Sequence, residues 1–445
     1  MADINTVVGE RIAKGRRRRG WHQSDLGAAV GRSESWVGQI ERGVIPLENL
    51  SVAESIAAAL GLSLEHVLAF DIRCPKPAEP PPVSHHGRPR SPVPAAQPLE
   101  DSESVERRTF VIGSMAGLTT ALAGLPQDTA DRIDRGRSGT VDAATIADLR
   151  MMAVGYRNAY RSVPATALLP LAQGQISLVL SLQPASQPER QRADLLEQLG
   201  EMAALAAVVS FLDLRDYGGG ERYLNLAQQV YRATESPELA ALTLAGRAFH
   251  VGYGGDREGG LDCALAAVDH AERGASPRMR AWAYAVLSEM HATVSDDYAC
   301  RTALDTARAH LDQALEGERW GGIGSFDLSK LDAYQGGDMV RLGHYDEALT
   351  ALDTALQRLD PSMYRHRATA YADRADAHAA AGHQDAACED AHQALALLEQ
   401  VHQAETLRRI TTLHRALRKT NTPATRALAE HVIDVRSTFA AGSRT

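Results

Sequence analysis

The chain has 445 residues, a formal net charge of −9 and few aromatic residues, 5% of the total. A chain of this length holds two or three domains, each with its own core. Alanine and leucine are abundant and runs of β-branched residues are scarce, which favours helices over sheets. No apolar run approaches the roughly 20 residues that cross a bilayer, and the first residues do not resemble a secretory signal. We therefore expect a cytoplasmic protein with no membrane partner.

The cysteines and histidines lack the spacing of a metal site. The four cysteines lie far apart and form no CxxC pair; they are Cys74, Cys263, Cys300 and Cys388. The sixteen histidines are scattered as well. This pattern indicates reduced thiols rather than disulfides or a zinc site, and we expect no metal and no other cofactor. The glycine-rich "WGGIGS" at 320–325 follows no predicted strand, so it does not indicate a nucleotide-binding loop, and we expect no enzyme activity.

Charge is unevenly distributed along this acidic chain. Residues 1–42 hold eight Arg or Lys against five Asp or Glu, and five of these bases lie in "KGRRRR" at 14–19. One basic corner on an acidic chain is typical of a DNA-binding head joined to a body that does not bind DNA. A solvated charged face is the alternative interpretation.

Residues 1–72 are predicted to form a compact domain of five helices. The first helix covers "VVGERIAKGRRRRGW", with its apolar positions at Val8, Ile12 and Trp21. The second covers "QSDLGAAVG" and is expected to turn Leu26, Ala29 and Val30 inward. Two further helices are predicted within 47–70.

The third helix, "SESWVGQIERG", has clear start and stop signals. Gly31 permits a tight turn before it, and the Ser33 hydroxyl caps its first turn. Val37 and Ile40 are spaced to anchor one face in the core, and Gly43 ends the helix. Such a short helix, with many polar positions and few apolar ones, suits the reading of a DNA groove.

Residues 7–70 closely resemble the lambda-repressor-like (XRE) helix-turn-helix family. The residues that carry the resemblance are Gln23, Leu26, Gly31, Ser33, Val37, Ile40 and the "IERG" ending. In that family the third helix lies in the major groove of DNA. The resemblance also implies a structural ion pair between Arg16 and Glu41.

The resemblance implies a set of DNA contacts. Base edges would be read from the third helix by Glu34, Ser35 and Gln39, and the cap residue Ser33 is counted among the DNA-binding residues. Phosphates would be held by Gln23, Arg17, Arg18, Arg19 and Arg32. Trp36 stands where a small residue is usual, and it can stack on DNA, pack on the protein surface or form a dimer contact. Gly38 and His22 also depart from the usual pattern, since Gly38 loosens the helix and His22 replaces a Ser or Thr cap.

A proline-rich linker is predicted at 73–103. The stretch 74–98 holds nine of the nineteen prolines, a composition that favours an extended tether. From 104 to 445 the pattern repeats helix, turn, helix. The clearest units are "GHYDEALTALDTALQRLDP" at 343–361 and "GHQDAACEDAHQALALLEQ" at 382–400, which start 39 residues apart.

These two units resemble tetratricopeptide repeats. The resemblance rests on Gly343, Tyr345, Ala348 and Pro361, and it is looser upstream of about residue 330. It implies stacked helical hairpins that form a curved α-solenoid with a concave wall. The whole chain is therefore predicted to be all-α: a five-helix DNA-binding head, a proline-rich linker and a repeat array.

The combination of head and array resembles two groups of regulators: peptide-sensing quorum regulators of Gram-positive bacteria, and actinobacterial XRE–TPR regulators. It implies a transcriptional regulator that binds operator DNA as a homodimer, with the array serving to dimerise, to bind a peptide or small effector, or both. Candidate effector residues are Tyr156, Arg157, Tyr160, Arg161, Trp282, Tyr284, Tyr334, Tyr364, Arg365 and Tyr371. Packing between hairpins is the alternative for each. The alternative function is a protein-interaction scaffold or antitoxin-like partner that binds DNA for autoregulation.

Overall fold

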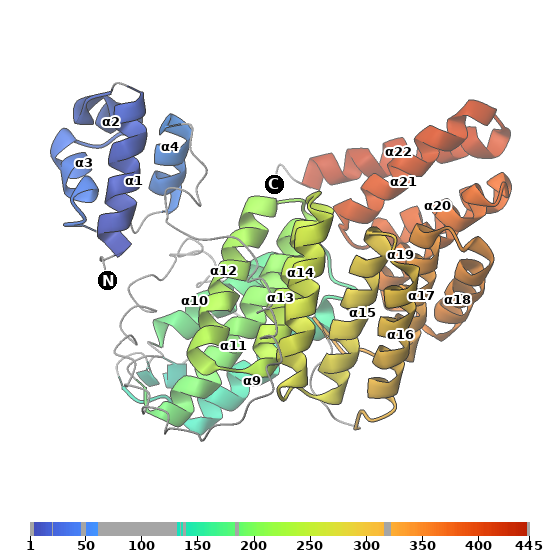
Figure 1. The fold of residues 1–445 in the computed structure, drawn as a ribbon, viewed down its shortest axis with the longest axis horizontal. Helices are drawn as coiled ribbons and strands as arrows, with labels where there is room; N and C mark the ends of the chain where they lie inside the picture. The colour runs from blue at the N-terminus through green and yellow to red at the C-terminus, as the bar shows by residue number, and fades with distance from the viewer. Residues whose placement is uncertain are drawn as a thin grey trace, which may run out of the picture. The chain divides into compact units, whose positions relative to one another are not determined.

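The protein is described by a computed structural model, shown in Figure 1. The structure describes residues 4–19, 21–45, 50–60, 131–133, 135–136, 139–182, 187–315 and 322–442. The secondary-structure elements of these residues are helices, which confirms the all-α prediction. The chain divides into two compact units, a head with residues 4–60 and a repeat domain with residues 131–442 among the described ranges. The predicted linker, 73–103, lies outside the described residues.

The head domain packs short helices around a small apolar core. The helices are α1 (Ile4–Arg18), α2 (Gln23–Ala29), α3 (Glu34–Glu41) and α4 (Leu50–Leu60). The core holds Val8, Ile12, Leu26, Val37, Ile40, Val52, Ile56, Ala57 and Leu60. The apolar periodicity of the first three helices therefore correctly predicted that Val8, Ile12, Leu26, Val37 and Ile40 are buried. Of the two helices expected within 47–70, α4 is one, and residues 61–70 lie outside the described residues.

Close backbone contacts in the head depend on glycine. A Cβ at Gly9 of α1 would lie 2.4 Å from the carbonyl oxygen of Ile40 and would separate α1 from α3. A Cβ at Gly27 would lie 2.6 Å from the carbonyl oxygen of Arg32, where the chain turns towards α3. Gly27 is buried and Ala29 is exposed, so the prediction that Ala29 turns inward was wrong.

The predicted signals around α3 are confirmed. Gly31 adopts a left-handed backbone with φ of 65°, and Gly43 does the same with φ of 69°. The Ser33 hydroxyl accepts a hydrogen bond from the Trp36 amide at 3.2 Å and caps the helix. Local chemistry alone therefore determines where this helix begins and ends.

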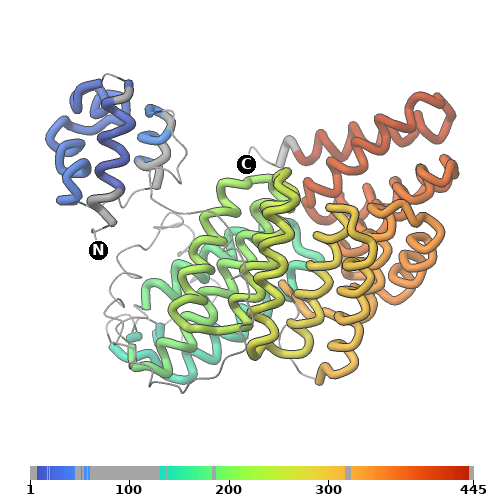
Figure 2. Tube along the Cα trace, in the orientation of Figure 1, coloured from blue at the N-terminus to red at the C-terminus, as the bar shows by residue number. Residues whose placement is uncertain are grey.

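The repeat domain is a row of antiparallel helical hairpins. Its helices are α9 (Ala143–Ala159), α10 (Ala165–Ser181), α11 (Glu189–Val208), α12 (Tyr217–Thr234), α13 (Pro237–Tyr253), α14 (Arg257–Glu272), α15 (Pro277–Thr293), α16 (Asp297–Leu311), α17 (Leu328–Leu342), α18 (Tyr345–Arg358), α19 (Tyr364–Ala380), α20 (Gln384–Leu398), α21 (Ala404–Leu417) and α22 (Pro423–Gly442). A π-helical turn, η2 (Val209–Asp213), extends α11, and a short 3-10 turn, η3 (Arg418–Thr420), follows α21. The odd-numbered helices from α11 to α21 pack on one another in chain order, and Figure 2 traces this row.

The unit at 343–361 forms as its pattern predicts. Gly343 ends α17 in the left-handed region with φ of 85°. Ala348, Leu352 and Ala355 are fully buried. A Cβ at Gly336 would lie 2.4 Å from Leu352 Cγ, so the two helices of this hairpin approach closely. The array is thus built like tetratricopeptide repeats, with small residues where helices cross.

One helix of the array contradicts the expectation that no apolar run could cross a bilayer. The span Glu189–Asp213, which comprises α11 and η2, is long and apolar enough by length and composition. Its residues are mostly buried among the neighbouring helices. It therefore serves as the central core helix of the repeat domain, which explains its apolar composition.

Arg365 joins distant parts of the repeat domain. It begins α19, and its Nε atom donates to Asp213 Oδ2 of η2 at 2.9 Å. Its backbone amide and Nη1 atom donate to carbonyl oxygens of the α9–α10 turn, at Arg161, Tyr160 and Val163. The side chains of Arg365 and Asp213 are only 1% and 0% exposed. These contacts fasten the beginning of the array to its sixth hairpin.

Candidate nucleic-acid interface

The polar edge of α3 faces away from the head core. Glu34 and Ser35 are exposed and Gln39 is half-buried, while Val37 and Ile40 on the opposite face are 1% and 2% exposed. The Gln39 amide lies 3.5 Å from Ser35 Oγ, at the limit of a hydrogen bond. The side chains predicted to read base edges are therefore accessible to a ligand.

An ion pair beneath α3 fixes the helix against α1. Arg16 Nε and Nη2 donate to the two carboxylate oxygens of Glu41 at 2.6 and 2.8 Å, and Nη1 donates to the Trp21 carbonyl oxygen at 2.7 Å. The hydrogen bond with Glu41 raises the pKa of Arg16. The predicted Arg16–Glu41 pair is confirmed, and its two parallel hydrogen bonds orient α3.

Gln23 is tied to the same carboxylate. Its Nε2 atom donates to Glu41 Oε2 at 2.7 Å, and its Oε1 atom would lie 3.2 Å from a Cβ at Gly38. Gly38 therefore makes room for Gln23, a role that its sequence position did not reveal. The predicted phosphate contact of Gln23 stays a prediction, and in this structure its side chain positions α3.

In the first turn of α2, a side chain inside the helix bonds back to the cap residue, instead of the cap side chain bonding forward into the helix. His22 stands at the cap position, and its backbone amide donates to Asp25 Oδ2 at 2.7 Å. Sequence reasoning noted the unusual cap residue but missed Asp25. The signal that could have revealed this contact was an acidic residue three positions after the cap residue.

The arginines predicted to contact phosphate differ in their surroundings. Arg17 is exposed, and the side chain of Arg18 lies outside the described part of the chain. Arg19 Nη1 donates to the Ala59 carbonyl oxygen of α4 at 2.6 Å, and its guanidinium lies 5.5 Å from the centre of the Trp21 ring.

Arg32 and Trp36 lie together at the amino end of α3. The Arg32 guanidinium is 5.6 Å from the centre of the Trp36 ring. Trp36 is half-buried and packs against the head core on its other side. The stack presents a cationic, flat surface beside the exposed polar edge of α3.

Residues 7–70 match the model of a family described as a helix-turn-helix domain. The N-terminal segment is a helix-turn-helix domain. Its match, with the geometry of α2, the Gly31 turn and α3, supports a DNA-binding regulatory protein rather than an enzyme. The match covers the head domain.

Two solved structures are similar to the chain. One is Bacillus thuringiensis PlcR in complex with the peptide PapR7 and DNA, at 12% identity and a TM-score of 0.25, covering 93% of this chain and 99% of that chain. The other is the P58(IPK) TPR domain, at 13% identity and a TM-score of 0.19, covering 76% of this chain and 89% of that chain. No curated protein matches. At these TM-scores we draw nothing further from either likeness.

Four of the ten predicted effector residues, Arg157, Tyr160, Trp282 and Arg365, are buried inside the repeat domain. Trp282 is 7% exposed and Tyr160 is 9% exposed, with the Arg365 guanidinium 4.7 Å from the centre of the Tyr160 ring. Arg157 Nε donates to the Ile323 carbonyl oxygen at 3.2 Å, and its Nη1 atom lies 3.3 Å from Glu201. These contacts make the side chains part of the packing in this structure.

The remaining predicted effector residues keep some accessible surface. Those that are half-buried are Tyr156, Tyr284, Tyr334, Tyr364 and Tyr371. Arg161 is exposed, and its carbonyl oxygen accepts from the Arg365 amide at 3.3 Å. The structure therefore does not bring the ten residues into one site.

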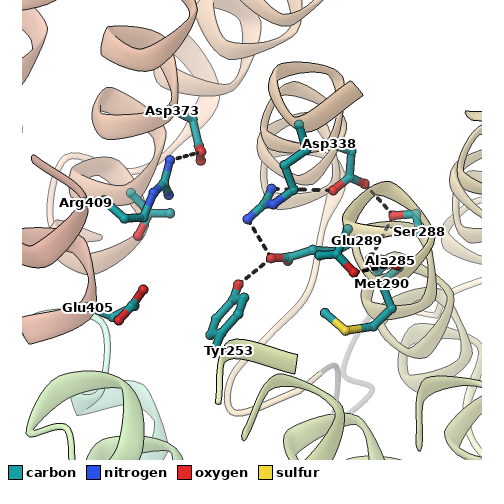
Figure 3. A network of polar contacts seen from close by, with 12 residues as sticks. Tyr253, Ala285, Ser288, Glu289, Met290, Asp338, Asp373, Glu405 and Arg409 are labelled. Carbon is teal, nitrogen blue, oxygen red and sulfur yellow. Dashed lines mark hydrogen bonds and ion pairs between the residues drawn. The ribbon is translucent and has the colours of Figure 1, made fainter. Parts of the chain in front are cut away.

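The odd-numbered helices carry instead a ladder of opposite charges that sequence reasoning missed. Figure 3 shows Tyr253 donating to Glu289, which Arg341 Nη2 also approaches at 2.7 Å. Farther along the row, Arg409 Nη2 lies 2.5 Å from Asp373 Oδ1. Arg341 and Arg409 keep 27% and 21% of their side chains exposed. No pattern in one helix predicts this ladder, because Tyr253, Glu289 and Arg341 come from different hairpins, as do Asp373 and Arg409.

Asp338 forms the most deeply buried part of the ladder. It is fully buried, Ser288 Oγ donates to its Oδ2 atom at 2.7 Å, and Arg341 Nη1 lies 3.8 Å from its Oδ1 atom. Burial and the nearby Glu289 carboxylate raise the pKa of Asp338 well above its usual range.

The described residues contain no group of three or more His, Cys, Asp or Glu that could hold a metal ion. Cys263, Cys300 and Cys388 are buried thiols, whereas Cys74 lies outside the described ranges.

Proposed function

We propose that the protein is a sequence-specific transcriptional regulator that places α3 in the major groove of operator DNA. The observation that carries this proposal is the outward polar edge of a helix whose other face is anchored in the core of a helix-turn-helix domain. A helix of this width fits the major groove, where each base pair presents a distinct set of donors and acceptors.

The side chains on this edge suit different parts of DNA. Gln39 can form paired hydrogen bonds with adenine, and Glu34 can accept from cytosine, while Ser35 bonds either partner. Arg17 and the Arg32–Trp36 stack suit the sugar–phosphate backbone, because backbone contacts need charge and flat apolar surface rather than a base code. Ser33 also aids from its cap position, since the free amides of a helix start attract phosphate.

We further propose that the regulator binds as a homodimer and that the repeat domain senses a peptide or small effector. One small head covers one half-site, so a palindromic site needs two heads. The charge ladder on the odd-numbered helices, with the partly exposed Tyr253, Arg341 and Arg409, offers donors and acceptors for a polar effector. Native mass spectrometry of the chain purified from its own host checks both points: it should show two copies and, in part of the sample, an added mass that is lost on unfolding.

DNA recognition is tested by selecting bound duplexes from a random pool with the full chain. The wild type should enrich one sequence family, and Gln39→Ala should relax the preference at one or two positions. Each lost paired contact should reduce discrimination by about 1–3 kcal/mol. The matched control is Gln393→Ala, an exposed glutamine on α20, which should enrich the same family as the wild type. The proposal fails if no sequence is enriched, or if Gln39→Ala selects the wild-type family unchanged.

A further inference from the structure

The turn between α21 and α22 is a concentrated basic surface. Four exposed bases lie on or beside it: Arg415, Arg418, Lys419 and Arg426, which together we name the basic turn. From residue 406 to residue 429 the sequence has no Asp or Glu. Arg408 and Arg409 of the same stretch are paired with Glu405 and Asp373. No carboxylate among the described residues forms an ion pair with the basic turn, on a chain of net charge −9.

The five hairpin turns from α11–α12 to α19–α20 carry acids at the corresponding place, whereas the α9–α10 turn has Pro164 there. Asp216, Asp256 and Asp296 cap α12, α14 and α16 through their carboxylates. The first turns of α18 and α20 hold Asp346, Glu347 and Asp385. In α22 the cap is the neutral Thr422, whose hydroxyl accepts from the Thr425 amide at 3.2 Å. The α21–α22 turn thus carries positive charge where the five hairpins before it carry acids.

Helix stability does not explain this reversal. Arg415 and Arg418 lie at the carboxyl end of α21, where cations are favoured, but Arg426 lies near the amino end of α22, where the helix dipole disfavours them. Like charges crowded on one exposed turn also repel one another in the free protein. Burial and the neighbouring Arg418 and Arg415 lower the pKa of His414, a sign of the local positive potential. A surface of this kind is stabilised when it binds a polyanion.

We propose that the basic turn binds the phosphate backbone of duplex DNA and forms a second DNA contact, distinct from the helix-turn-helix domain. The inference rests on the proposed DNA-binding function and extends it to the repeat domain. Four guanidinium or ammonium groups on one turn suit phosphates spaced along a strand. The contact carries no base preference, because none of the four side chains is held against a neighbour that would orient it.

The experiment compares Arg415→Gln/Arg418→Gln/Lys419→Gln in the full chain with the wild type. Affinity for a duplex containing the enriched sequence and long flanks is measured from 50 to 200 mM salt. Loss of three phosphate contacts should lower the slope of log affinity against log salt by about 2.7. The affinity ratio of wild type to variant should therefore fall about fortyfold across that range. The matched control is Arg190→Gln/Arg215→Gln/Arg232→Gln, which removes three exposed bases elsewhere on the repeat domain and should keep the wild-type slope.

The outcomes separate this inference from the function on which it rests. Failure of the wild type to bind any duplex contradicts the DNA-binding function itself. Wild-type binding with an unchanged slope in the basic-turn variant overturns the second contact alone. A variant that keeps its DNA slope but no longer binds vesicles containing phosphatidylglycerol would assign the turn to anionic membrane instead. Equal thermal unfolding of the two triple variants verifies that both remain folded.

Discussion

The two domains place their polar side chains in opposite ways. The helix-turn-helix domain keeps an apolar centre and leaves Glu34 and Ser35 of α3 exposed. The repeat domain buries Asp338 and Arg365 and pairs charges between successive hairpins. An interface for DNA needs exposed polar atoms, because buried ones are already satisfied or desolvated. In an array whose hairpins contact mainly their neighbours, polar contacts between hairpins help to determine how each hairpin packs on the next.

The largest loss of stability is expected from removing the buried guanidinium of Arg365. Arg365→Ala leaves Asp213 as an unpaired buried carboxylate and frees the α9–α10 turn, so it should lower the free energy of unfolding of the repeat domain by about 3–5 kcal/mol. Urea denaturation measures the loss, and hydrogen exchange should show faster exchange at Tyr160–Val163 and in η2.

The control for Arg365 is Arg358→Ala. Arg358 pairs with Asp332 at 2.7 Å but its side chain is 54% exposed, so its loss should cost less than about 1 kcal/mol. Similar losses in both variants would contradict the role of Arg365 as the fastening residue.

The next largest loss of stability is expected from a substitution in the head domain. Gly9→Ala places a methyl group 2.4 Å from the Ile40 carbonyl oxygen, so α1 and α3 must move apart. We expect a loss of about 1–3 kcal/mol in head stability and weaker DNA binding, measured by thermal unfolding and by fluorescence anisotropy. Gly155→Ala is the matched control, because a Cβ there meets nothing within 4 Å, and it should stabilise α9 by up to about 1 kcal/mol. A neutral Gly9→Ala would show that the helices are not in close contact.

A pH effect should be confined to the repeat domain. Burial, with the neighbouring Lys330 and Arg365, lowers the pKa of His366 well below its usual value. As the pH falls below about 6.5 the unfolded chain takes up a proton that the folded chain does not, so His366 loses its stabilising contribution. When the pH is lowered from 7.5 to 5.5, the free energy of unfolding of the wild type should therefore fall more than that of His366→Gln. A difference that is independent of pH contradicts this expectation.

The smallest effect concerns the support beneath α3. Gly38→Ala gains helix propensity but brings a methyl group within 3.2 Å of Gln23 Oε1, a mobile side-chain end. We expect stability to change by less than about 0.5 kcal/mol, while the Gln23 side-chain amide resonance shifts as its bond with Glu41 rearranges. An unchanged resonance would show that Gln23 does not pack on Gly38.

Several features were missed because their partners are distant in sequence. The role of Gly9 depends on the carbonyl oxygens of α3, and that of Gly38 on the first residue of α2. Arg365 was predicted to face an effector, yet it lies buried against Asp213, 152 residues away. A pattern along one helix shows which face is apolar, but it does not show which residue on another helix meets a polar side chain.

The amino-acid sequence by itself determined the helical class, the caps and turns around α3, the Arg16–Glu41 pair through family resemblance, and the buried face of the unit at 343–361. Apart from that ion pair, these features follow from short-range chemistry: side-chain periodicity, hydroxyl caps and glycines in left-handed turns. The tertiary structure alone decided which polar residues are exposed, how the charge ladder is paired and where the array is fastened. Those features depend on free energies of desolvation and pairing between segments that only folding brings together.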